Sequence, residues 1–155
     1  MSDREDIKKI KEIAEEFFEK MTISALRIEA GFSDTLDAVD LDIKLEEPQI
    51  LIGERGQTLF EIQRLLKTVL NKKLQKIFYL NLDINEYKKK KIEYLKDLAK
   101  GLADEVALNK EEKVLFPMPA YERRIIHTEL SQRTDIITES QGEGLDRHIV
   151  IRPKL

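Results

Sequence analysis

The sequence predicts an α+β protein built from two small domains. Three patterns in the first half support this: apolar residues recur at helical spacing over residues 4–20, alternate with charged residues over 39–46, and return to helical spacing over 57–73. The second half has its own pattern of a long helix, a shorter helix and two strands. With 155 residues, 41% of them hydrophobic, the chain can form two small cores. We expect domains at residues 1–84 and 85–155.

The first half reads as seven successive elements. In chain order these are a helix at 4–20, a strand at 23–30, a turn at 31–34, a strand at 39–45, a short helix at 48–52, a helix at about 57–73 and a strand at 76–83. The strand at 39–45 has the clearest period-two alternation in the chain, which is typical of a half-buried strand. The strand at 23–30 should place four residues on one face: Ser24, Leu26, Ile28 and Ala30.

A glycine loop separates the short helix from the long one, with the sequence Gly53-Glu54-Arg55-Gly56. Glycine lets a backbone turn sharply and bring its N–H groups toward an anion, and the start of the next helix adds partial positive charge. A GxxG loop of this kind clamps about four single-stranded nucleotides in KH domains. We expect an exposed loop in which two Gly→Asp changes block binding and spare the fold. The alternative is a tight helix–helix turn with no ligand.

The order of elements over residues 1–84 resembles the type II KH fold of bacterial proteins. This resemblance implies a three-stranded mixed sheet with three helices. One position departs from the family, because KH loops usually carry basic residues where this chain has Glu54. Either Glu54 points away from the ligand, or the loop binds weakly. The predicted nucleic-acid-binding residues of this half are Gly53, Glu54, Arg55, Gly56, Gln57, Thr58, Arg64 and Lys67.

The second half is predicted to contain a helix at 86–107, a short strand at 114–116, a helix at 120–131 and strands at about 134–140 and 147–152. The apolar stripe of the long helix should consist of Tyr87, Tyr94, Leu95, Leu98, Leu102 and Val106. On the shorter helix, Arg123 and His127 are four residues apart and therefore share one face. Ile126 and Leu130 share another, which we expect to face the core.

The Arg-x-x-x-His spacing is that of the R-3-H domain, and its wider frame is more specific. Residues 119–127, 138–144 and Arg147 before the run 149–151 resemble the Jag-type (SpoIIIJ-associated) bacterial proteins, which join a KH domain to an R-3-H domain. The resemblance implies a small α/β domain with helices packed on a three-stranded sheet. Many family members carry a further small N-terminal domain, which we expect this chain to lack.

Arginine and histidine suit a nucleic-acid ligand. The Arg123 guanidinium can hold a phosphate through two hydrogen bonds or stack on a base, and His127 can donate to phosphate or stack. We expect both to project into a basic concavity shared with Arg147 on the last strand. Arg124 could reach the ligand or only the protein surface. The alternative pairs Arg123 with Glu122 or Glu129 and makes His127 a packing residue, and His148 is as readily structural as functional.

The charge distribution bears on the partner. The net charge of −3 argues against nucleic-acid binding, but residues 1–61 hold 8 basic and 16 acidic residues, whereas residues 62–155 hold 19 basic and 14 acidic. A local basic strip matters more for phosphate contacts than the total. The lysine run at 88–91 is either part of that strip or a solvated helix face. Aromatic residues make up 6% of the chain, so backbone contacts should dominate over base stacking.

The remaining composition limits the function classes. There is no cysteine, only two histidines and no recognisable catalytic motif, so we expect neither a metal, a cofactor nor an enzyme. No apolar stretch reaches about 20 residues, so we expect no membrane span and a cytoplasmic location. The predicted function is non-catalytic binding of single-stranded RNA. Single-stranded DNA, a role in post-transcriptional or cell-shape regulation, and a protein-interaction adaptor with a weak KH domain stay open, as does the oligomeric state.

Overall fold

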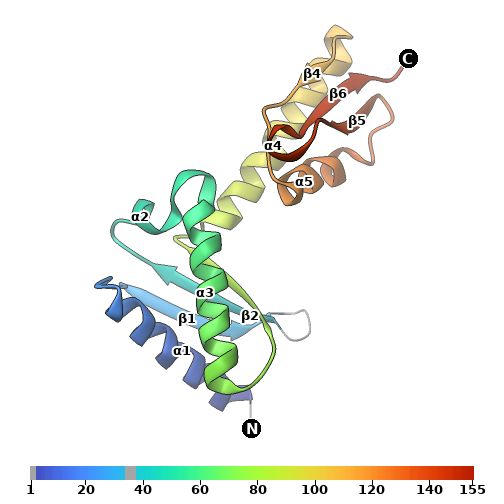
Figure 1. Cartoon of the computed structure of the whole chain (residues 1–155). Helices are drawn as coiled ribbons and strands as arrows, with labels where there is room; N and C mark the ends of the chain where they lie inside the picture. The colour runs from blue at the N-terminus through green and yellow to red at the C-terminus, as the bar shows by residue number, and fades with distance from the viewer. Residues whose placement is uncertain (1–2, 34–37) are drawn as a thin grey trace. The chain divides into compact units, whose positions relative to one another are not determined.

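The computed structural model describes residues 3–33 and 38–155 (Figure 1). The chain divides into two compact units, residues 1–88 and 89–155, and each is described by itself. The helix α4 (Tyr87–Asn109) begins in the first unit and continues through the second. The described part is α+β, as the sequence predicts.

The first unit contains a mixed three-stranded sheet with the order β1-β2-β3. Its strands are β1 (Arg27–Phe32), β2 (Ala38–Lys44) and β3 (Tyr79–Ile84). β1 pairs with β2 antiparallel, with Ile28 opposite Ile43, and β2 pairs with β3 parallel, with Leu41 opposite Leu82. The predicted mixed sheet is therefore present, and β1 and β3 are its edge strands.

Helices α1 (Asp3–Lys20) and α3 (Gln57–Leu74) pack on this sheet (Figure 1). Their amphipathic patterns supply one core with the alternating strand residues, because every second residue of β2 faces the helices. The fully buried members include Phe18, Leu41, Leu59, Leu66 and Leu82. Between β2 and α3 come the short α2 (Gln49–Ile52) and the 3₁₀ turn η1 (Glu54–Gly56).

The predicted first strand and its turn are wrong at both ends. The chain leaves α1 through a hydrogen bond from the Ile23 N–H to the Phe18 carbonyl, so residues 23–26 precede the strand, and Leu26 is 57% exposed. Gly31 and Phe32, predicted to turn, belong to β1 because they pair with β2. Asp34 lies outside the described residues. The third strand likewise begins at Tyr79 rather than at residue 76.

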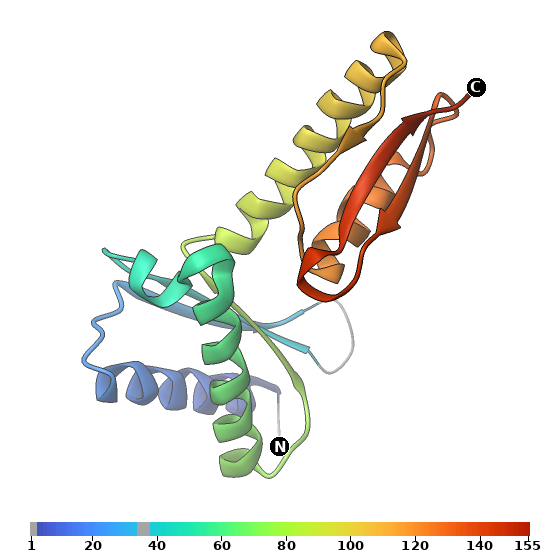
Figure 2. The same cartoon turned by 45° about the horizontal axis from the view of Figure 1, so that its top comes forward.

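The second unit contains an antiparallel sheet with the order β4-β6-β5. Its elements after α4 are β4 (Lys113–Val114), α5 (Ala120–Leu130), β5 (Ile136–Gln141), the 3₁₀ turn η2 (Gly144–Asp146) and β6 (His148–Pro153). Residues of α4 and α5 share one core with Leu115, Ile149 and Ile151, so both helices cover the same face of the sheet (Figure 2).

The apolar stripe predicted for α4 is only partly right. The buried residues are Leu95, Ala99, Ala103 and Val106, whereas Tyr94 is 52% exposed. Small alanine side chains allow the sheet and α5 to approach the helix closely, and the prediction missed them because it weighted large apolar residues. The predicted strand at 114–116 also differs, since β4 ends at Val114 and Phe116 is exposed.

Candidate nucleic-acid interface

The glycine loop adopts a backbone that its sequence requires. Gly53, Arg55 and Gly56 have φ angles of 72°, 55° and 79°. A Cβ on Gly53 would collide with Thr58 Oγ1, and one on Gly56 would lie 2.8 Å from Tyr87 Cε1. Gly56 is also buried. The expectation that two Gly→Asp changes would spare the fold is therefore wrong, because the glycines are packed as well as turned.

The side chains between and after the glycines are accessible to a ligand. Glu54, Arg55 and Gln57 are exposed, and Thr58 is half-buried beside Gly53. The loop leads directly into α3, whose N-terminal cap position is Gly56. Arg55 therefore offers an exposed guanidinium at the helix start, with the Glu54 carboxylate next to it in the chain.

The rest of α3 carries cations along its length. Arg64 is exposed on this helix. The Lys67 ammonium lies 4.9 Å from the centroid of the Tyr79 ring, at the start of β3. This cation–π contact holds Lys67 beside the edge strand. The sequence did not indicate a role for Tyr79, because its contact with Lys67 depends on the packing of β3 against α3.

Lys88 is tied into a polar network that the sequence analysis also missed. Its Nζ donates to Gln63 Oε1 (2.5 Å) and Asn81 Oδ1 (2.9 Å) and lies 5.0 Å from the centroid of the Phe60 ring. Gln63 Oε1 also accepts the Leu82 N–H (2.9 Å) at the edge of the sheet. Burial lowers the pKa of the Lys88 ammonium, and the carboxylates of Asp83 and Asp40 partly offset this effect.

The lysine run is thus not one uniform charged face. Lys89 and Lys90 are exposed, while Lys91 lies 3.7 Å from the buried Glu122 carboxylate and 5.5 Å from the centroid of the Tyr94 ring. Two of the four lysines are therefore committed to contacts within their own unit. The strip of exposed cations is narrower than the sequence alone indicates.

In the second unit, β5 positions Arg123 and His127. Arg123 Nε donates to the Met118 carbonyl (3.1 Å), and its Nη1 donates to Ser140 Oγ (3.3 Å). His127 Nδ1 lies 2.6 Å from Thr138 Oγ1. Thr138 and Ser140 are two residues apart, so their side chains point to the same side of β5. They therefore hold the side chains of Arg123 and His127 along this strand.

Arg123 does not form an ion pair with Glu122 or Glu129, the two acidic residues near it on α5. Glu122 is paired with Lys91, and Glu129 lies 3.1 Å from the Lys100 ammonium. Arg123 is half-buried and bonded to neutral oxygens, and His127 is exposed. Because a neutral acceptor leaves the positive charge uncompensated, the Arg123 guanidinium stays available to an anion. Arg124 is exposed beside it.

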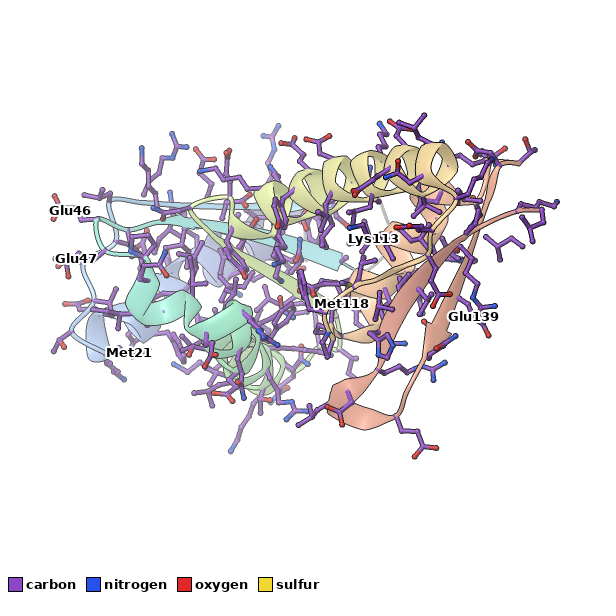
Figure 3. All side chains as sticks on the ribbon, turned by 90° about the horizontal axis from the view of Figure 1, so that it is seen from above. Met21, Glu46, Glu47, Lys113, Met118 and Glu139 are labelled. Carbon is purple, nitrogen blue, oxygen red and sulfur yellow. The ribbon has the colours of Figure 1, made fainter. Side chains whose placement is uncertain are left out.

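Arg147 lies just before β6 and not on the last strand, where it was expected. Its Nη1 donates to the Gly142 carbonyl (2.7 Å), which closes the turn between β5 and β6. Its own carbonyl accepts the Met118 N–H (3.2 Å). Met118 thus joins the backbone of Arg147 to the guanidinium of Arg123. Figure 3 shows the Met118 side chain within the second unit and the exposed Glu139 pointing outward.

Comparison with known proteins defines the class of the second unit. Residues 93–153 match the R-3-H domain family, and this range includes Arg123, His127 and Arg147. The chain therefore carries an R-3-H domain, and its predicted resemblance to the Jag-type proteins is confirmed.

The individual relatives share one name. RNA-binding protein KhpB of Clostridium symbiosum is 36% identical over 143 residues, covering 92% of this chain and 64% of the relative. RNA-binding protein KhpB of Bacillus subtilis is 41% identical over 111 residues, covering 70% and 53%. The protein of that name in Streptococcus pneumoniae is 28% identical over 131 residues, covering 83% and 40%. The chain spans less than two thirds of these relatives' length.

Among residues 3–33 and 38–155, each helix is too short or too polar to cross a membrane. The exposed acidic pair Glu46 and Glu47 extends into solvent beside α2 (Figure 3). Solvation thus accounts for these neighbouring carboxylates.

Proposed function

We propose that this protein binds single-stranded RNA without catalysing a reaction. The observation that carries the proposal is the pair on α5. Arg123 is anchored on neutral oxygens of Met118 and Ser140, and His127 stands exposed four residues later. Such a pair can engage a phosphate and an adjoining unpaired base. The relatives named RNA-binding protein KhpB favour RNA as the ligand.

The first unit acts as a type II KH domain in this proposal. Its mixed sheet, its packed glycine loop and the exposed Arg55 support that assignment. The loop would contact phosphates, while Arg64 and Lys67 continue along α3. Two weak sites on one chain raise each other's effective concentration on a single RNA strand. A role as a post-transcriptional regulator in the cytoplasm is the cellular form of the same proposal.

The test is binding of a labelled single-stranded RNA to the full chain, measured by fluorescence anisotropy over a range of salt concentrations. The expected result is saturable binding that weakens as salt rises, since phosphate contacts release counterions. Arg123→Ala should weaken binding, and Lys96→Ala, which removes an exposed lysine of α4, should not. A DNA strand of the same sequence measures the contribution of the 2′-hydroxyl groups. Equal, salt-independent binding by all three proteins contradicts the proposal.

A protein-interaction adaptor is the second candidate, and one observation favours it. Glu54 is exposed at the centre of the loop, where its carboxylate repels phosphate. In this alternative the first unit docks a protein partner, for example in the pocket between α1 and β1 whose lining includes Glu15, Glu19 and Ile23. RNA binding that depends only on Arg123 and His127, and not on Arg55, would support the adaptor role for the first unit.

A further inference from the structure

We propose a second contact surface on the R-3-H unit: Phe116 and His148 form a stacking platform for one unpaired nucleobase. This inference rests on the proposed RNA binding and deepens it. The platform lies on the face of the sheet opposite α4 and α5, away from the side chains of Arg123 and His127. The sequence alone left open whether His148 is structural or functional.

The pairing of β4 with β6 places Phe116 and His148 on the same face of the sheet. Val114 pairs with Val150, and the Leu115 N–H donates to the Ile149 carbonyl (2.9 Å), so pairing extends one residue past the end of β4. The next bond runs from the Met118 N–H to the Arg147 carbonyl (3.2 Å), one residue out of this register. Leu115 and Ile149 are both buried in the core. Because side chains alternate between the faces of a sheet, Phe116 and His148, the neighbours of these two residues in the chain, fall on the opposite face, beside Val114 and Val150. Phe116 is 51% exposed.

His148 is oriented by its own backbone. Its Nδ1 lies 2.8 Å from the Asp146 carbonyl oxygen, which can only accept, so Nδ1 carries the proton. In the neutral ring, Nε2 then holds a lone pair that can accept from a base amino or imino group. The Phe116 ring supplies the stacking surface, and stacking on aromatic side chains tolerates any base.

Charge argues against a phosphate as the occupant of this face. Arg152, the cation on the same side of β6, is paired with both Glu139 and Glu112. The other uncharged residues that the pairing places on this face are Val114, Val150, Ile137 and Gln141, and three of these four are apolar. Three exposed apolar side chains mark this side: Phe116, Val114 and Ile137. A stable protein interface involves about 20–30 residues on each partner, many more than these three. A single flat base fits that area better.

The platform and the Arg123 site lie on opposite faces of the sheet but are joined by the short backbone segment 116–118. Phe116 is two residues before Met118, whose carbonyl accepts the Arg123 Nε–H and whose N–H donates to the Arg147 carbonyl. Two residues span at most about 7 Å of extended chain. A strand held by Arg123 can therefore pass the end of the sheet at Pro117 and lay a neighbouring base on Phe116.

The experiment uses the absence of tryptophan from the chain. Phe116→Trp places a single indole on the platform, and Ile137→Trp is the matched control at a 48% exposed position of the same face. Each full-length variant is titrated with a short single-stranded RNA and with an abasic ribose-phosphate strand of equal length. We expect the RNA to quench Phe116→Trp saturably, the abasic strand to leave it bright, and Ile137→Trp to change little.

Binding measurements complete the test. Phe116→Leu keeps an apolar side chain and removes the ring, and it should weaken RNA binding about fivefold or more. Unchanged binding by Phe116→Leu, or equal quenching of the two tryptophans, overturns the platform. If Arg123→Ala still weakens binding in that case, the proposed function survives without it. If the parent binds no RNA, both ideas fail together.

Discussion

Gly56 packs directly against Tyr87: a Cβ at Gly56 would lie 2.8 Å from Tyr87 Cε1, and Gly56 holds a φ of 79°. The loop before α3 therefore rests on the first residue of α4, within the first unit. Gly56, which the sequence indicates as part of a phosphate-binding loop, is therefore also packed against another residue. Substitutions there change stability as well as binding, so they do not isolate the contribution of the loop to RNA affinity.

Gly56→Ala should destabilise the first unit by about 1–3 kcal/mol, because the new methyl group meets the Tyr87 ring and a non-glycine residue is strained at this φ. Denaturant unfolding followed by circular dichroism measures the change. Gly31→Ala is the matched control, since its Cβ would meet nothing within 4 Å. Equal stability of the two variants would show that the loop yields without cost.

Glu54→Lys should strengthen RNA binding and steepen its salt dependence, because residue 54 is exposed and an added phosphate contact releases a counterion. The expected increase in the slope of log K against log salt is about 0.7 for a single strand. Glu12→Lys, an exposed position on α1, makes the same charge change away from the loop. If both variants gain equally, net charge explains the effect and residue 54 does not touch the ligand.

Arg123→Ala and His127→Ala should each weaken binding of single-stranded RNA, by about 1.5–3 and 0.5–1.5 kcal/mol. The double variant should lose less than the sum if both side chains hold the same nucleotide. Thr138→Val should reproduce part of the His127 loss, because it removes the hydroxyl 2.6 Å from Nδ1. Thr128→Val, at an exposed position of α5, is its control. Strict additivity would place the two side chains on separate nucleotides.

Lys88 should make the first unit more stable as pH rises. Its pKa is lowered by burial in the folded state, so between that pKa and the ordinary value of 10.5 the unfolded chain binds more protons. Below the folded-state pKa, the buried ammonium lowers the free energy of unfolding by its full amount. As pH rises from that pKa toward 10.5, the folded state loses the charge first, and the free energy of unfolding increases. The stability of the parent relative to Lys88→Met should rise over this range in unfolding measurements. Lys72→Met, at an exposed position of α3 in the same unit, is the control for the loss of one lysine. A constant difference for Lys88→Met contradicts the assignment.

Periodicity by itself determined which segments form the helices and most of the strands. The amphipathic patterns of α1 and α3 and the alternation of β2 are local, because a helix or strand repeats its buried face every few residues. The four-residue spacing of Arg123 and His127 likewise placed both on one face of α5. The KH assignment of the first unit and the ligand contacts of the loop stay predictions.

Only the tertiary structure decided how these residues are held. The contacts of Gly56 with Tyr87, of Lys88 with Gln63, and of Arg123 with Ser140 join residues 31, 25 and 17 positions apart. Strand ends also depended on pairing partners, which is why Gly31 and Phe32 entered β1 although they read as a turn. Such contacts depend on which elements pack together, and local periodicity does not predict that packing.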